Sequence, residues 1–251
     1  MTKLKNIIIP EIGYNHLGSL YNLRHAMITI AKEFGQFTIQ YRENLNKSDL
    51  LFQIDIKIIL NEIKSLRLIC DDVSIGLATE SLEVIMDYGK YFDFFKILSI
   101  GINNKNLINY LSKQDKLHIY SVGNTPISEL NSRIGKFYYP NKIPYLNFTS
   151  FDISGIDIST SEIKELSSKC EGLCYGLHQK DDILLYSAFS IFTISFLFVY
   201  VSLSLDPIIK PDHIHSRSIN ELKNMTQNLS AILDFKSRSQ RTNLKDFKNE
   251  T

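Results

Sequence analysis

The stretch IIIPEIGYNHLGS, residues 7–19, decides the fold of this chain. Its isoleucine run is typical of a strand buried on both faces of a parallel sheet. An acid, a glycine and an Asn-His pair follow, and a Gly-Ser turn then opens an amphipathic helix at residues 20–34. A buried strand that carries polar side chains to its C-terminal end and turns at once into a helix is typical of an α/β barrel.

Strand and helix signals alternate along the rest of the chain. Strands are expected at residues 6–9, 37–40, 73–77, 92–98, 117–122, either 136–139 or 145–148, 172–176, and 196–205. Helices are expected at residues 20–34, 49–67, 81–88, 104–112, 126–134, 160–169, before the last strand, and at 219–235. This order predicts an α/β protein with a single (β/α)8 TIM barrel over residues 1–235, followed by a polar, disordered tail at 236–251. An open doubly wound sheet is the alternative, but its phosphate-binding glycine fingerprint is absent from the sequence.

The composition is that of a globular protein. The chain has 251 residues, 44% hydrophobic and 22% charged, with a net charge of +1, so no strong field favours nucleic acid. The three cysteines, Cys70, Cys170 and Cys174, are too few for a secreted disulfide framework. No signal peptide is recognisable, so we expect a cytoplasmic protein.

One apolar run allows two interpretations. Residues 183–205 contain no charged side chain and are long enough to span a bilayer. The competing interpretation is a barrel helix that runs into a buried strand. Five serines and a threonine dilute the hydrophobicity, and Phe, Val and Tyr enrich the second half, so we favour the barrel over a membrane anchor.

Polar residues at the expected strand ends are the candidates for chemistry, because barrel sites lie there. Lys96 stands in the otherwise apolar segment FDFFKILS, and Glu11 stands between Pro10 and Ile12, so each needs a buried partner. An ammonium among hydroxyls binds phosphate or carboxylate. We therefore expect Glu11 and Lys96 to share one cavity.

Five segments, in order, resemble the sialic acid (N-acetylneuraminate) synthase family and its legionaminic and pseudaminic acid relatives. They are EIGYNHLGS at 11–19, GLATE at 76–80, FFKILS at 94–99, YSVGN at 120–124 and PDHIHS at 211–216. The resemblance covers about residues 7–233. It is a divergent one, and no segment resembles the family's small C-terminal antifreeze-like domain.

The resemblance implies a phosphoenolpyruvate-dependent transferase of carbohydrate biosynthesis. Such enzymes join phosphoenolpyruvate to an N-acetylated hexose, release phosphate and form a nonulosonic acid. A divalent metal, Mn or Mg, polarises the sugar aldehyde. The resemblance assigns a catalytic role to Glu11. It assigns substrate binding to Asn15, Gln40, Thr79, Lys96, Ser99, Ser121 and Asp212.

Some positions depart from the family pattern. The family's second-strand lysine aligns with Thr38. Its metal histidine after the seventh strand falls on His178 if two residues are deleted and on Lys180 otherwise. Its second metal histidine becomes Ser202, so we expect a degraded metal site.

Two functions follow from the resemblance. The first is an active synthase. The alternative is a catalytically inactive barrel that binds a sugar phosphate or a partner enzyme in surface-polysaccharide biosynthesis. In either case we expect no contact with nucleic acid or membrane, and a homodimer or a complex with a partner synthase is left open.

Overall fold

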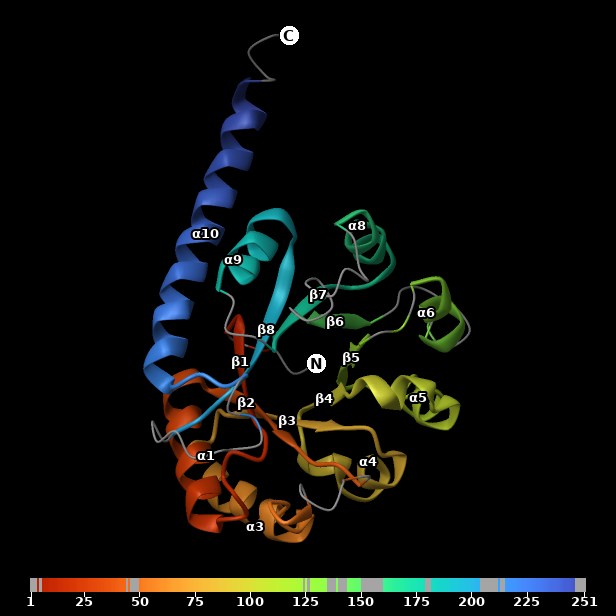
Figure 1. Ribbon diagram of the computed structural model, residues 1–251, viewed down its shortest axis with the longest axis vertical. Coiled ribbons are helices and arrows are strands. Elements are labelled where there is room, and N and C mark those ends of the chain that lie inside the picture. The colour runs from red at the N-terminus through yellow and green to blue at the C-terminus, as the bar shows by residue number, and fades with distance from the viewer. Residues whose placement is uncertain are drawn as a thin grey trace.

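The computed structural model describes residues 4, 6–43, 45, 50–123, 125, 127–134, 139, 144–149, 160–178, 182–203, 212 and 215–246. Its parallel strands follow one another in chain order around a closed barrel, and β8 pairs with β1 (Figure 1). They are β1 (Ile8–Ile12), β2 (Gln36–Gln40), β3 (Ser74–Thr79), β4 (Phe94–Ile97), β5 (Leu117–Ser121), β6 (Tyr145–Thr149), β7 (Leu173–Leu177) and β8 (Ile194–Tyr200). The predicted single (β/α)8 TIM barrel is confirmed.

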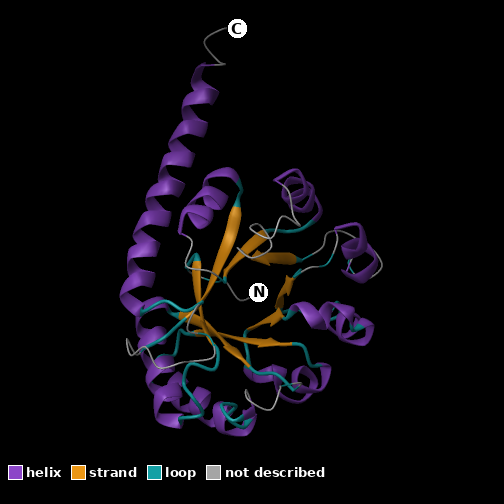
Figure 2. Ribbon diagram, viewed as in Figure 1, coloured by secondary structure: helices purple, strands orange, loops and turns teal. Residues whose placement is uncertain are grey.

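Helices surround the strands on the outside of the barrel (Figure 2). They are α1 (Leu20–Phe34), α3 (Ile56–Arg67), α4 (Leu82–Tyr88), α5 (Lys105–Leu111), α6 (Ile127–Ile134), α8 (Thr160–Lys169), α9 (Asp182–Ile191) and α10 (Ile219–Asp246), with short 3-10 helices η1 (Gly89–Tyr91) and η2 (Ser99–Asn103). The first helix begins where the sequence predicts, because the Ser19 side chain accepts a hydrogen bond from the Asn22 amide. It ends at Gly35, whose φ of 66° is the left-handed conformation that favours glycine.

Several boundaries differ from the sequence-based expectation. The first strand, expected at 6–9, is Ile8–Ile12, and the eighth, expected at 196–205, is Ile194–Tyr200. Of the two alternatives for the sixth strand, the structure has β6 at Tyr145–Thr149. The helix expected from residue 49 begins only at Ile56, because the Asp55 carboxylate accepts from the Lys57 amide and caps the helix there. The last helix, expected to end at residue 235 before a disordered tail, runs on to Asp246 (Figure 1). No glycine or proline interrupts residues 219–246, so nothing in the sequence stops it earlier.

The apolar run at 183–205 divides into α9 and the buried strand β8. Lys236 on α10 donates hydrogen bonds to the Phe189 and Phe192 carbonyls, at 2.9 and 2.8 Å, where α9 ends. Among the described residues, no helix combines the length and apolarity needed to cross a bilayer.

Two separate clusters of apolar side chains make up the core. The larger one fills the space between the outside of the barrel and the helices. The smaller one fills the barrel interior with Ile9, Phe94, Ile119, Cys174 and Phe198. Two positions further along each of these strands, on the same face and toward the C-terminal end, lie Glu11, Lys96, Ser121, Gly176 and Tyr200. The interior is therefore apolar at the base and largely polar at the end where barrel sites form.

Candidate functional site

A buried ion pair crosses the barrel at the base of its polar end. The Nζ atom of Lys96 on β4 lies 2.6 Å from Oε2 of Glu11 on β1, and the two side chains are 3% and 1% exposed. The same ammonium lies 4.6 Å from the centroid of the Phe198 ring, a cation–π contact. The second carboxylate oxygen, Oε1 of Glu11, is buried without a hydrogen-bond partner among the described residues. Glu11 and Lys96, which were expected in one cavity, are thus in direct contact, although only Lys96 lines the cavity described next.

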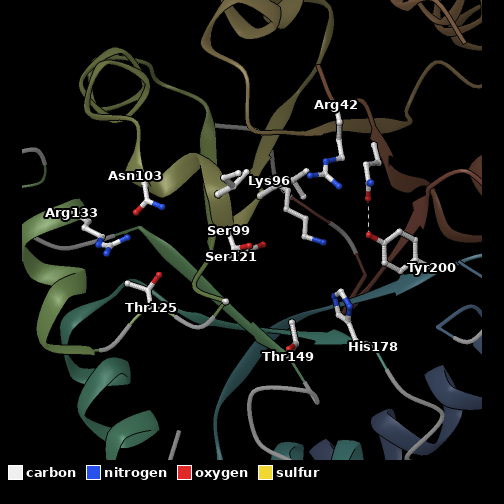
Figure 3. Close-up of a pocket in the computed structure, with 14 residues that line it drawn as sticks. Arg42, Lys96, Ser99, Asn103, Ser121, Thr125, Arg133, Thr149, His178 and Tyr200 are labelled. Atoms are coloured by element: carbon white, nitrogen blue, oxygen red, sulfur yellow. Dashed lines mark hydrogen bonds between the residues drawn. The ribbon is translucent and has the colours of Figure 1, made fainter. Parts of the chain in front are cut away.

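Above this ion pair, a cavity of about 620 Å³ opens at the C-terminal ends of the strands (Figure 3). Three cations line it, namely Arg42, Lys96 and Arg133. Four serine and threonine hydroxyls line it as well, those of Ser99, Ser121, Thr125 and Thr149. Cationic and hydroxyl groups around one cavity are suited to an anionic ligand such as a phosphate or carboxylate.

Tyr200 and Gln40 form one wall of this cavity. The Tyr200 hydroxyl donates to the amide oxygen of Gln40 at 2.6 Å. Burial, and next the Glu11 carboxylate, raise the pKa of Tyr200 well above its usual value, so the phenol stays protonated and remains a donor. The Gln40 side chain also makes a hydrogen bond with Tyr14, so both ends of its amide are held at the cavity wall.

Arg42 enters the cavity from the loop that follows β2. Its Nε atom lies 3.7 Å from Oε2 of Glu80, a long contact for an ion pair. About a third of the Arg42 side chain is exposed, at 32%. The guanidinium is therefore only loosely held by its acid and can turn toward an anion in the cavity.

His178 lies on the cavity wall beyond β7. Burial, the Lys96 ammonium and His215 lower its pKa to about 3, so the imidazole is neutral at neutral pH. Its ring centroid lies 5.9 Å from that of Tyr200 and 5.4 Å from that of His215. The Nδ1 atom of His215 is itself hydrogen-bonded to the His178 backbone carbonyl.

These residues do not fit the metal centre that the sequence resemblance implies. No group of three or more His, Cys, Asp or Glu side chains that could hold a metal ion occurs in the part of the chain that the structure describes. Glu11 is paired with Lys96, and the cationic ammonium close to His178 opposes a second cation there. Ser202, at the family's second histidine position, is buried and contributes a hydroxyl in place of an imidazole.

Asn15 and Asp212 join two loops and do not line the cavity. The Tyr14 amide donates to Oδ2 of Asp212 at 2.6 Å, and the Asp212 amide donates to Oδ1 of Asn15 at 3.2 Å. The Asn15 side chain also donates to the Val201 carbonyl at 3.0 Å. We call this set of contacts the β1–β8 clasp, because it fastens the loop after β1 to the chain after β8.

The clasp also explains why residue 13 is a glycine, because no side chain fits there. A Cβ atom there would collide with the Asp212 carboxylate and lie 2.8 Å from the Tyr200 ring. Thr79 is another residue expected at the site, but its hydroxyl accepts from the Ser81 amide at 3.2 Å in the turn after β3.

The structure therefore divides the residues predicted for the site into three groups. Those on the cavity wall are Gln40, Lys96, Ser99, Ser121 and His178. Glu11 lies beneath it as the partner of Lys96, whereas Asn15, Thr79 and Asp212 make contacts elsewhere. Sequence reasoning missed Arg42 and Arg133. Arg42 follows Gln40 by two residues at a strand end, a spacing that could have indicated it, but no sequence signal marks Arg133.

No protein-family model matches the chain, and no curated protein matches it either. Solved structures, in contrast, do match the chain. N-acetylneuraminic acid (sialic acid) synthetase from Leptospira borgpetersenii serovar Hardjo-bovis superposes with a TM-score of 0.76 at 20% identity, over 92% of this chain and 84% of that one. The chain has the fold of this synthetase.

Two further structures are similar. The spore coat polysaccharide biosynthesis protein SpsE from Bacillus subtilis gives a TM-score of 0.70 at 14% identity, over 93% of this chain and 70% of that one. A truncated 3-deoxy-D-arabino-heptulosonate 7-phosphate synthase from Thermotoga maritima gives 0.62 at 11% identity, over 93% and 89%. The resemblance to sialic acid synthases that the strand-end motifs indicate is thus confirmed for the fold.

Proposed function

We propose that the chain binds phosphoenolpyruvate at the buried end of the cavity and condenses it with an N-acetylated hexose to form a nonulosonic acid. The observation that carries this proposal is the position of Lys96. Its buried ammonium lies at the C-terminal end of β4, on the same cavity wall as the Ser99 and Ser121 hydroxyls. An ammonium with hydroxyls around it can hold both the phosphate and the carboxylate of a small phosphorylated acid.

The condensation forms a carbon–carbon bond between phosphoenolpyruvate and the sugar aldehyde, consumes a water molecule and releases phosphate. Lys96, Ser99 and Ser121 hold the anionic groups of phosphoenolpyruvate. Glu11 fixes the Lys96 ammonium through Oε2, and its second oxygen is the acceptor for a hydroxyl or water proton at the base of the cavity. A divalent metal would polarise the aldehyde; no group of three or more His, Cys, Asp or Glu side chains among the described residues could hold one.

The names of two similar structures support a role in carbohydrate biosynthesis. One is an N-acetylneuraminic acid synthetase, and the other is a spore coat polysaccharide biosynthesis protein. A biosynthetic role of this kind belongs in the cytoplasm.

The second candidate is a barrel that binds the same phosphorylated ligand, or a partner synthase, without turnover. Two observations favour it. Lys96 is already neutralised by Glu11 at 2.6 Å, and the described residues supply no three-ligand metal set. The two candidates differ in one measurable quantity, which is the release of phosphate.

Calorimetric titration with phosphoenolpyruvate tests the shared part of both proposals. We expect saturable binding to the wild-type protein and a loss of about tenfold or more in affinity for Lys96→Gln. Since Lys96→Gln also breaks a buried ion pair, Ser121→Ala provides a milder variant, with an expected loss of a few-fold. Lys57→Gln, on the exposed face of α3, is the charge-matched control and should bind as the wild type does.

A phosphate-release assay with N-acetylmannosamine then separates the two candidates. It is run with Mn²⁺ and, in parallel, with a chelator. Phosphate release above that of Lys96→Gln supports the synthase. Binding without release supports the inactive barrel. A wild-type protein that does not bind phosphoenolpyruvate refutes the synthase and the ligand-binding form of the inactive barrel.

A further inference from the structure

Lys96 becomes a nucleophile when it loses its proton. The amine of a buried lysine beside a proton acceptor can attack the carbonyl carbon of a ketone and form an imine. Nζ of Lys96 lies 2.6 Å from Oε2 of Glu11, and both side chains are almost fully buried. Lys96 also lines the cavity, so a ligand there can reach this nitrogen. The structure thus places a nucleophile and its base together at a ligand site.

The proton that must leave Lys96 has an acceptor in direct contact. Oε2 of Glu11 already accepts a hydrogen bond from Nζ. Transfer of the proton along this bond leaves an amine and a carboxylic acid, and two neutral groups cost less to bury than two charges. Burial therefore lowers the cost of forming the amine.

The surroundings of Nζ also suit the product of the attack, because a protonated imine keeps a positive charge on the lysine nitrogen. The centroid of the Phe198 ring lies 4.6 Å from this nitrogen, and the ring face stabilises a cation. The Glu11 carboxylate is the counter-ion at the same place. The two contacts that stabilise the ammonium therefore stabilise the protonated imine as well.

The second carboxylate oxygen of Glu11 is a further proton acceptor. Oε1 is buried and has no hydrogen-bond partner among the described residues. A buried acceptor without a donor is unfavourable, and a ligand atom that gives up a proton next to Nζ removes this cost. In the imine of a 2-oxo acid, the carbon next to the C=N bond carries such acidic protons.

Hydroxyl groups on the same wall favour a ketone that also carries a carboxylate. Ser99 and Ser121 line the cavity together with Lys96. Figure 3 shows the Lys96 side chain extending into the cavity from the same side as these two serines. Their hydroxyls can donate to a carboxylate, and they remain donors when Lys96 is a neutral amine.

We propose that Lys96 forms an imine with a small 2-oxo acid such as pyruvate, and that Glu11 converts this imine to an enamine. Glu11 takes a proton from Nζ, and the amine adds to the C2 carbonyl carbon. Two of the three ammonium protons pass through Glu11 to the carbonyl oxygen, which leaves as water while the nitrogen lone pair forms the C=N bond. Loss of a C3 proton to Glu11 then forms the C2=C3 bond and returns the C=N electron pair to nitrogen.

The enamine carries a nucleophilic C3 atom, as phosphoenolpyruvate does. It can form the same kind of carbon–carbon bond to an aldehyde, with no phosphate to release. This activity goes beyond the proposed function and does not depend on it, because the imine forms from the 2-oxo acid alone.

Reduction of the imine tests the proposal on the wild-type protein. The protein is incubated with pyruvate and cyanoborohydride, which converts an imine to a stable secondary amine, and the modified lysines are identified by mass spectrometry of its peptides. We expect labelling of Lys96 to saturate with pyruvate and to exceed that of the exposed Lys57 at least about tenfold. Labelling of Lys96 no greater than that of Lys57 would overturn the proposal.

Variants test the part that Glu11 takes. Glu11→Gln removes the base and should slow the labelling of Lys96 about a hundredfold. In D₂O the wild-type protein should exchange the methyl protons of pyruvate for deuterium, as followed by NMR, and Lys96→Gln should not. Ser121→Ala leaves the ion pair intact and should raise the half-saturating pyruvate concentration a few-fold. An unchanged labelling rate in a folded Glu11→Gln protein refutes the role of Glu11.

Excess phosphoenolpyruvate separates this proposal from the proposed function. It has no ketone and forms no imine, so its binding at Lys96 should suppress the labelling. Labelling that phosphoenolpyruvate does not suppress supports the imine and counts against phosphoenolpyruvate binding at that place. A wild-type protein that is not labelled at Lys96 refutes the imine, and the proposed function is then still decided by phosphate release.

Discussion

Glu11 and Lys96 meet inside the barrel with Oε2 and Nζ 2.6 Å apart, although β2 and β3 separate their strands in the sheet. Both side chains are almost fully buried, so each charge depends on the other for its stabilisation. The pair joins opposite parts of the wall at the level where the apolar interior ends. It therefore links the stability of the barrel to the chemistry of the cavity above it.

A double-mutant cycle on this pair should show strong coupling. Lys96→Met leaves a buried carboxylate unpaired and Glu11→Gln leaves a buried ammonium unpaired, so each single change should lower the free energy of unfolding by about 3–5 kcal/mol. The double variant leaves no unpaired charge and should be more stable than either single variant. Urea denaturation measures all four proteins. Additive losses would show that the two groups do not depend on each other.

The β1–β8 clasp should matter for stability and not for ligand affinity. Asp212→Ala removes the acceptor of the Tyr14 amide and should cost about 1–3 kcal/mol of unfolding free energy. The affinity for phosphoenolpyruvate should stay within about twofold. Asp234→Ala, an exposed position on α10, is the matched control. Unchanged stability together with a large loss of sugar affinity would instead restore Asp212 to the sugar-binding role implied by the sequence resemblance.

Buried histidines should make the fold sensitive to acid. Burial lowers the pKa of both His16 and His118 from 6.5 to about 4. The unfolded chain therefore binds more protons than the folded one between these values, so stability should fall as the pH decreases from about 6.5 to 4. Each group contributes roughly 1 kcal/mol per pH unit in this window.

His118→Phe tests the acid sensitivity at one position. The His118 ring stacks on Phe95 with centroids 6.0 Å apart, and a phenyl ring can keep that contact. Its Nε2 atom is buried without a hydrogen-bond partner among the described residues, so the change removes no hydrogen bond at that atom. We expect the variant to lose less stability than the wild-type protein between pH 6.5 and 4. Denaturation curves of equal pH dependence would contradict this.

Gly76 on β3 should not tolerate a methyl group. A Cβ atom there would overlap the Phe94 ring and lie 2.8 Å from Cγ2 of Thr38. Overpacking of this kind should make Gly76→Ala about 1–3 kcal/mol less stable. Phe94→Leu in the same chain should recover part of the loss by making room, which thermal unfolding can measure. If Phe94→Leu instead lowers the stability of Gly76→Ala by as much as it lowers that of the wild-type protein, the clash is not the cause of the loss.

Much of the barrel could be predicted because its strands carry local signals. The run Ile7–Ile9 and the segment around Lys96 are apolar enough to be recognised as buried strands, and Ser19 and Gly35 mark the ends of α1. Other boundaries depend on single contacts. Asp55 starts α3 by capping it, and a sequence in which residues 49–67 are all acceptable helix formers does not show this.

The cavity residues that could be predicted lie on strands or within two residues of a strand end, as Ser99 and His178 do. The strand periodicity brings Gln40, Lys96 and Ser121 to one end of the barrel. The positions of Arg133 and Asn103 depend on how α6 and η2 pack, which no local pattern encodes. Asn15 and Asp212 make loop contacts that the sequence did not indicate, since a polar side chain at a strand end can satisfy a neighbouring loop as readily as a ligand.

During synthesis, β1 leaves the ribosome long before one of its two partners exists. Ile8 pairs with Leu197 of β8, and the Val201 amide donates to the Glu11 carbonyl at 3.0 Å. Until those residues emerge, one edge of β1 exposes unpaired amides and carbonyls to other nascent chains. Ring closure is therefore a late step of folding, and before it occurs the first strand is open to pairing with other chains.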